Sequence, residues 1–168
     1  MDAQRPVPQR AVLLVTGMSG SGKSAALAEL ALRGHRAVDT DDPGWVVDID
    51  TVDGPEPVWD LERIKARVAQ RRTGWLFIGG CVANQGAVYD RFDAVVLLSA
   101  PVDVLLRRVA DRLNPFGSTA QQRATIADDH AAYEPLLRAC ASHEIATTTP
   151  LATVVATLEE IAETVSGP

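Results

Sequence analysis

The stretch VTGMSGSGKS, residues 15–24, constrains the fold of this chain more than any other segment. It contains the pattern GxxxxGK followed by serine, and it lies between an apolar run at 11–16 and a helical pattern at 24–33. A glycine-rich turn in that position directs backbone N–H groups into one concavity at the helix N-terminus, where they meet phosphate oxygens. The sequence therefore predicts a phosphate-binding loop, or P-loop, for ATP or GTP.

Each residue type in this loop has a chemical purpose. Glycines adopt backbone angles that other residues avoid, Lys23 brings a positive charge to the β and γ phosphates, and the Ser24 hydroxyl can ligate Mg²⁺. ATP and Mg²⁺ are the expected cofactors. The predicted nucleotide-binding residues are Gly17, Met18, Ser19, Gly20, Ser21, Gly22, Lys23, Ser24 and Ala25.

Strand and helix signals alternate along the rest of the chain. Apolar runs predict strands at 11–16, 35–39, 75–80, 94–100 and 144–147, and helical periodicity predicts helices at 24–33, 101–113, about 121–143 and from 150 onward. Pro135 is expected to kink or divide the third helix. We expect one three-layer α/β/α domain at 11–168 with a five-stranded, mostly parallel sheet, a P-loop NTPase fold of the kinase type. A flexible arm, 1–10, precedes it.

Composition narrows the class of partner. The 168 residues are 46% hydrophobic and 23% charged, and no apolar run approaches the roughly 18–20 residues that span a bilayer, so we expect a soluble protein without membrane contact. The first ten residues lack the apolar core of a secretory signal, which predicts a cytoplasmic location. A formal charge of −6 opposes nonspecific binding to nucleic acid. Small molecules are the expected partners, and the oligomeric state stays open.

Two cysteines, Cys81 and Cys140, lie far apart in the sequence and have no metal-ligand spacing. Free cysteine is among the most buried residue types in folded proteins. We therefore expect both thiols to be reduced and buried.

An acidic cluster follows the second predicted strand. Many P-loop ATPases and GTPases carry an acid at the end of a later buried strand, but the runs at 75–80 and 94–100 end without one. The acids instead occur in Asp39-Thr40-Asp41, and Gly79-Gly80 ends the strand at 75–80. With the P-loop and an arginine-bearing helix before a lid-like loop, this order resembles the small P-loop kinases over roughly residues 11–125. It resembles shikimate kinase in particular, and the wider group that contains nucleoside monophosphate kinases and gluconate kinase.

The resemblance implies a phosphotransferase that moves the γ-phosphoryl group of Mg-ATP to a hydroxyl or phosphate of a small acceptor. By the same resemblance, Asp39 assists the metal site, and Asp41 binds the acceptor and is the candidate catalytic base. The acceptor-binding segment would cover about 39–74 and the lid-like loop about 112–123. A turn cluster before Pro43 is the alternative for these acids.

Four further residues are predicted to contact the acceptor. Gly79 and Gly80 would let the backbone approach it closely, although an ordinary turn at the strand end explains them equally well. Asn84 would offer neutral hydrogen bonds. Trp45 would stack on a ring of the acceptor, with a place in the core as the alternative.

Arg108 and Arg112 share one helical face that leads into the lid-like loop. Small kinases use such arginines, so Arg108 is predicted to cover the nucleotide and Arg112 to stabilise the transferred charge. The segment NPFGSTA itself has no lysine or arginine. A solvated face with Arg107 paired to Asp111 is the alternative.

The charge of the acceptor site is the most distinctive prediction. Eight acids and no lysine or arginine occur between Asp39 and Asp60. A basic stripe follows, in which Arg63 is the predicted acceptor contact and Arg67 and Arg71 recur at four-residue spacing. If that stripe faces solvent, the acidic segment predicts a hydroxyl-rich neutral or cationic acceptor.

Two other functions stay open at this point. A nonenzymatic nucleotide-binding regulatory module would explain the lack of basic residues in NPFGSTA and the lack of identifiable acceptor arginines. An NTP hydrolase is disfavoured because neither later strand ends in an acid.

Overall fold

The computed structural model describes residues 9–70, 73–112 and 119–167. Its main sheet has the strand order β2-β5-β1-β6-β7, and every pairing in it is parallel. The expected fold class, a five-stranded sheet flanked by helices, is therefore confirmed. The strands are β1 (Arg10–Thr16), β2 (Arg36–Asp39), β5 (Gly74–Gly79), β6 (Ala94–Ser99) and β7 (His143–Ala146).

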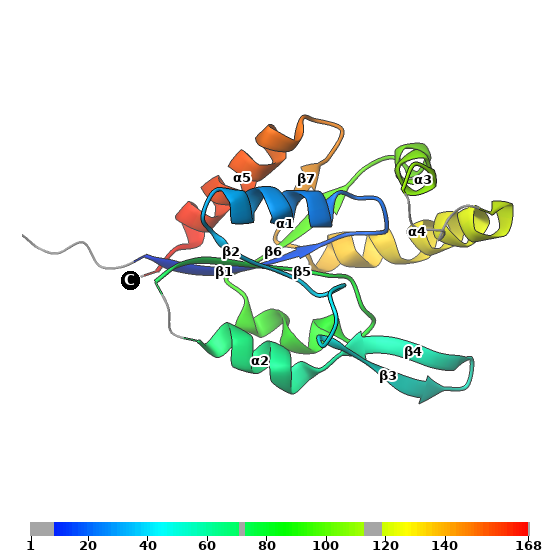
Figure 1. Cartoon of the computed structure of the whole chain (residues 1–168), viewed down its shortest axis with the longest axis horizontal. Helices are drawn as coiled ribbons and strands as arrows, with labels where there is room; N and C mark the ends of the chain where they lie inside the picture. Colours follow the sequence, from blue (N-terminus) through cyan, green and yellow to red (C-terminus); the bar gives the residue numbers. More distant parts are fainter. Residues whose placement is uncertain (1–8, 71–72, 113–118, 168) are drawn as a thin grey trace, which may run out of the picture.

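Side chains of the central strand β1 pack against helices on both faces of the sheet. Ala11, Leu13 and Val15 join one core cluster with helices α1 (Lys23–Leu32) and α5 (Leu151–Val165). Val12 and Leu14 join another with α2 (Leu61–Ala69) and the 3-10 helix η1 (Gln85–Arg91). Successive side chains of a strand point to opposite faces, so an unbroken apolar run fits a strand buried on both sides. Figure 1 shows the resulting three layers.

Two more helices lie toward the carboxyl ends of the strands, where the P-loop also lies (Figure 1). They are α3 (Val102–Ala110) and α4 (Ala120–Cys140). A small apolar cluster of Met18, Ala100 and Leu105, with Leu137 packed against it, connects the P-loop to both helices. The P-loop is therefore packed against both helices on this side.

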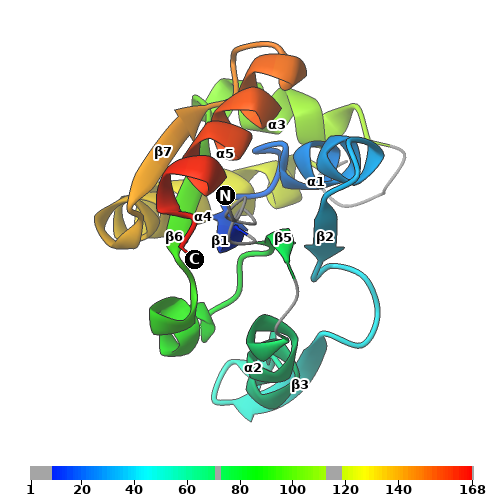
Figure 2. The same cartoon turned by 90° about the vertical axis from the view of Figure 1, so that its left-hand side faces the viewer.

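A β-hairpin that the sequence interpretation missed follows β2. Its strands β3 (Val46–Thr51) and β4 (Gly54–Trp59) pair antiparallel and form a separate two-stranded sheet. Figure 1 and Figure 2 both show the hairpin below the main sheet, on the side where α2 lies. The hairpin occupies the part of the chain that was expected to form the acceptor site.

Other expectations need smaller corrections. Helix α4 runs without interruption through Pro135, so this proline does not divide it. Arg10 belongs to β1 and pairs with Gly74, and residues 1–8 of the expected arm lie outside the described residues. Within the described ranges, no helix is both long and apolar enough to cross a bilayer.

Candidate functional site

The P-loop takes its shape from three glycines with positive φ. These are Gly17 at +153°, Gly20 at +83° and Gly22 at +95°. A Cβ at Gly17 would lie 2.4 Å from the Leu98 carbonyl oxygen, and one at Gly20 would lie 2.8 Å from the Leu105 carbonyl oxygen. Gly22 has no protein atom within 4 Å of the corresponding position, so the loop is open where it starts α1. No side chain caps this end of the helix, which leaves its first N–H groups available to an anion.

The ammonium group of Lys23 lies over the P-loop. Its Nζ donates to the carbonyl oxygens of Gly17 at 2.5 Å and Met18 at 3.2 Å. Burial lowers the pKa of Lys23, while the neighbouring Cys81, Asp41 and Asp39 side chains act to raise it. Burial thus disfavours the ammonium ion, and a phosphate chain would stabilise it.

Asp39 and Asp41 are brought toward Lys23 by the end of β2. Thr40 lies between them and is anchored to β5, because its backbone N–H and its hydroxyl both donate to the Gly79 carbonyl oxygen, at 2.9 and 2.8 Å. The backbone N–H of Asp41 donates to Asp39 Oδ1 at 3.0 Å. Both aspartates are near enough to raise the pKa of Lys23. The expected neighbourhood of P-loop and acidic cluster is present.

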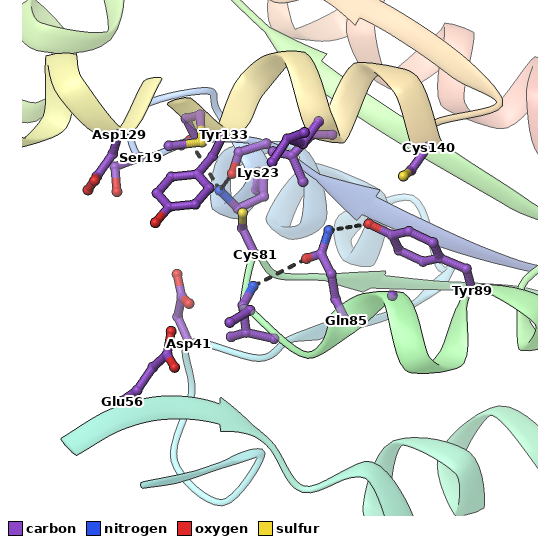
Figure 3. Close-up of a pocket in the computed structure, with 17 residues that line it drawn as sticks. Ser19, Lys23, Asp41, Glu56, Cys81, Gln85, Tyr89, Asp129, Tyr133 and Cys140 are labelled. Carbon is purple, nitrogen blue, oxygen red and sulfur yellow. Dashed lines mark hydrogen bonds between the residues drawn. The ribbon is translucent and has the colours of Figure 1, made fainter. Parts of the chain in front are cut away.

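A cavity of about 690 Å³ opens beside Lys23. Figure 3 shows side chains that reach it from the P-loop, from the segment after β2, from β4 and from α4. Its volume is in the range of small-molecule sites. The lining residues are Gly17, Met18, Ser19, Lys23, Asp41, Glu56, Cys81, Val82, Ala83, Gln85, Gly86, Tyr89, Asp129, Tyr133, Leu136, Leu137 and Cys140.

A protein-family model described as an AAA domain matches residues 13–125, which include the P-loop, the acidic cluster and much of the sheet. The chain belongs to this family. Among curated proteins, none matches the sequence.

Solved structures show the same fold as this AAA-domain chain. A shikimate kinase from Acinetobacter baumannii, in complex with shikimate, superposes with a TM-score of 0.62 at 20% identity, over 92% of this chain and 93% of that one. A shikimate kinase from Bacteroides thetaiotaomicron gives a TM-score of 0.63 at 17% identity, over 91% and 98% of the two chains. At these identities the likeness establishes the fold of the small P-loop kinases.

The predicted acceptor contacts Arg63 and Trp45 lie outside the cavity lining of the AAA-domain chain. The Arg63 guanidinium lies over the Trp45 ring, 4.8 Å from its centroid, and Trp45 packs on the core. Arg67 donates to Gln70 at 2.7 Å, and Arg71 is outside the described residues. The described part of the basic stripe therefore brings no positive charge into the cavity.

Gly79, Gly80 and Asn84 also have structural explanations. A Cβ at Gly79 would lie 2.3 Å from Leu27 Cδ1, and one at Gly80 would lie 2.1 Å from Thr40 Oγ1. Protein atoms, not an acceptor, therefore fill the space beside these glycines. Both ends of the Asn84 amide bond the backbone of Trp59, at 2.9 and 3.0 Å, which fixes the end of the hairpin. None of the three residues lines the cavity.

Arg108 lies on α3, but this helix ends at Ala110, so Arg112 follows the helix and does not share a helical face with Arg108 as expected. The two arginines have different surroundings. Arg108 donates to the Gly20 carbonyl oxygen at 3.2 Å and to the hydroxyl and carbonyl oxygens of Thr147, so its guanidinium is held by protein groups. Arg112 is exposed, and its positive charge contributes to lowering the pKa of Lys23. Arg107 pairs with Asp103 at 3.3 Å, not with Asp111. Of the lid-like loop, 113–118 lie outside the described residues.

The sequence interpretation missed the wall that α4 contributes to the cavity. Its lining residues recur at helical spacing, so the periodicity of the sequence contained a signal for one shared face. The expectation of buried thiols was wrong, because Cys81 and Cys140 are both exposed. The residues from α4 are Asp129, Tyr133, Leu136, Leu137 and Cys140.

Proposed function

We propose that this AAA-domain chain is a kinase that transfers the γ-phosphoryl group of Mg-ATP to a hydroxyl group of a small-molecule acceptor. The supporting observation is that a single cavity contains both the P-loop lysine, Lys23, and the carboxylate of Asp41. The fold shared with shikimate kinases, one of them in complex with shikimate, agrees with this reaction class.

The P-loop residues bind and orient the nucleotide in this proposal. Backbone N–H groups around Gly22 and the start of α1 hold the phosphates, and the Lys23 ammonium transfers its hydrogen bonds from loop carbonyls to phosphate oxygens. Arg112 adds positive charge from the segment just after α3. Arg108 acts indirectly, because it fixes the Gly20 carbonyl oxygen and hence the shape of the loop.

The chemical step needs a base beside the acceptor. Asp41 accepts the proton of the acceptor hydroxyl while the hydroxyl oxygen forms a bond to the γ-phosphorus. The bond from that phosphorus to the β–γ bridging oxygen breaks, and ADP leaves with the electron pair. Phosphoryl transfer depends mainly on alignment and charge stabilisation, so these few groups suffice.

The residues present fit a magnesium ion bound together with a nucleotide. Ser24 is exposed in the first turn of α1, and Asp39 lies near Lys23 at the end of β2. In the described ranges, no three His, Cys, Asp or Glu side chains are placed so that together they could hold a metal ion, and Mg²⁺ in nucleotide sites takes few protein ligands. Ser24 and Asp39 would hold the ion, which neutralises phosphate charge when bound.

Two substitutions in the full chain test the proposal. Lys23→Ala should nearly abolish phosphoryl transfer and weaken nucleotide binding. Asp41→Asn should lower kcat by roughly 100-fold or more, the contribution of a general base, and leave nucleotide affinity unchanged. Asp42→Asn is the matched control, because this neighbouring exposed acid does not line the cavity.

A broad screen measures ADP formation and the phosphorylated product with each acceptor. Full activity of Asp41→Asn would contradict its role as base. Nucleotide binding without transfer to any acceptor would favour a regulatory module, and fast phosphate release without an acceptor would favour an NTP hydrolase.

A further inference from the structure

Three carboxylates enter the cavity from different elements. Asp41 comes from the segment after β2, Glu56 from β4 and Asp129 from α4. Figure 3 shows Asp41 and Glu56 next to each other on one side, and Asp129 near Tyr133 on the other. Among the described lining residues, Lys23 is the only lysine or arginine. Since Lys23 serves the phosphates in the proposed function, the acceptor side of the cavity is negative.

These three side chains have no hydrogen-bond or ion-pair partner in the described part of the chain, and Glu56 and Asp129 are only partly exposed. Other partly buried acids are paired. Glu159, for example, lies 2.8 Å from Arg33, and the carboxylate of Asp60 accepts from the backbone N–H of Arg63 at 3.2 Å. Partly buried carboxylates without partners cost free energy, and a bound cation would offset that cost.

The other lining residues suit a compact ring. Met18, Leu136 and Leu137 provide apolar surface, and the Tyr133 side chain is 54% exposed although it lines the cavity. An exposed aromatic ring attracts a cation through its face and packs against the C–H groups of a sugar-like ring. The Gln85 amide contributes little to binding an acceptor, because it already forms hydrogen bonds with Thr16 and Tyr89.

From these observations we infer that the acceptor is a hydroxyl-rich ring bearing a protonated amine, that Asp41 receives the reacting hydroxyl, and that Glu56 and Asp129, on opposite sides of the cavity, both attract the ammonium charge. The inference rests on the proposed kinase function and names the substrate class of that site. An acceptor with a carboxylate or phosphate would instead be repelled by the same side chains.

Matched acceptor pairs test this class with the full chain and Mg-ATP at pH 7. Glucosamine is compared with glucose, and streptamine with scyllo-inositol, by ADP formation and by the mass of the product. A charge-assisted hydrogen bond corresponds to roughly a tenfold to hundredfold change in affinity, so the amine of each pair should have a kcat/KM higher by about that factor. Shikimate serves as the anionic acceptor and should be the poorest substrate.

Two variants assign the effect to the named carboxylates. Glu56→Gln and Asp129→Asn should each raise KM for the amines by roughly tenfold or more and leave KM for the neutral acceptors unchanged. The controls are Asp48→Asn on β3 and Asp128→Asn on α4, which remove the same charge from exposed residues outside the cavity lining. An equal effect of a control and its partner variant would overturn the assignment.

The outcomes separate the inference from the proposed function. Transfer to neutral or anionic acceptors as fast as to amines would overturn the inference and support the kinase. If no acceptor is phosphorylated, the kinase proposal fails, and calorimetric titration of the same pairs in the presence of a nonhydrolysable ATP analogue decides the inference. Tighter binding of the amines that is lost in Glu56→Gln would support it, and equal or absent binding would overturn it.

Discussion

Thr40 connects the acidic cluster to the protein core, and Thr40→Val tests that connection. The Thr40 side chain is buried, donates to the Gly79 carbonyl oxygen at 2.8 Å and accepts from Trp59 Nε1 at 2.9 Å. Valine has nearly the same shape but no hydroxyl group. We expect the substitution to lower stability and, because Asp39 and Asp41 flank this residue, to lower the rate of phosphoryl transfer as well.

The two lost hydrogen bonds set the size of the effect. Trp59 is 1% exposed, so water cannot replace the partner of its N–H group, and an unsatisfied buried donor costs about 1–3 kcal/mol. The Gly79 carbonyl oxygen keeps its bond from the Thr40 backbone N–H, so this second loss is an ordinary one of about 1 kcal/mol. The free energy of unfolding should therefore fall by about 2–4 kcal/mol. For a domain of this size, that is a fall in Tm of roughly 4–16 °C.

Urea unfolding followed by far-UV circular dichroism measures the change. Thr40→Ser is the control, because it keeps the hydroxyl and should lose only about 1 kcal/mol through the missing methyl group. A double-mutant cycle with Trp59→Phe isolates the bond, since phenylalanine has no N–H group to leave unsatisfied. The double variant should be more stable than the sum of the single losses implies, by about 1–3 kcal/mol. Additive losses, or a Thr40→Val loss below about 0.5 kcal/mol, would refute the reasoning.

Two further predictions concern an ion pair and a thiol. Hydrogen bonds from Arg138 and Ser99 hold the pKa of Glu144 below its ordinary value, so their contribution is present at neutral pH and is lost as the pH falls through the folded-state pKa. Glu144→Gln should therefore lower Tm at pH 7, and the difference in Tm from the wild type should disappear at acidic pH. Thermal unfolding measured across pH checks this, and a difference in Tm that does not change with pH would contradict it. Alkylation of Cys81 with iodoacetamide should weaken nucleotide binding, because this exposed thiol lies near Lys23. Mg-ATP should protect against it and Cys81→Ser should be insensitive, whereas equal inhibition of Cys81→Ser would point to Cys140.

The sheet and the P-loop could be predicted from the sequence because their signals are local. Strands β1 and β6 are continuous apolar runs, which a parallel sheet covered on both faces requires. The P-loop glycines adopt backbone angles and close contacts that few other residues allow, so the glycine pattern predicts the conformation of the loop. The acidic cluster was predicted at the correct end of β2 because it directly follows this strand in the sequence.

The hairpin and the cavity wall could not be predicted with the same ease. Strand β4 contains Pro55 and Pro57, and prolines in a sequence argue against a strand. They are tolerated here because β4 pairs only with β3, in a two-stranded sheet where Asp50 and Asp48 lie opposite them. Glu56 and Asp129 are 73 positions apart, and no local pattern indicates that they face one cavity. Arg63 was assigned to the acceptor because its spacing shows a stripe on a helix, but spacing does not show where that stripe points.

Helix α4 explains how a cavity wall rich in polar groups is held in place. One face presents Asp129 and Tyr133 to the cavity, and an adjacent face contains Glu134, which is 5% exposed. That carboxylate lies 2.8 Å from His130 Nε2 and 2.7 Å from Arg138, and Arg138 continues to the strand β7 through its ion pair with Glu144 at 2.9 Å. Because Glu134 is buried, separating it from Arg138 would leave its charge uncompensated, so this network resists displacement of the helix. His130 and Glu134 thus fix the position of the helix, and Asp129 can present an unpaired carboxylate to the cavity.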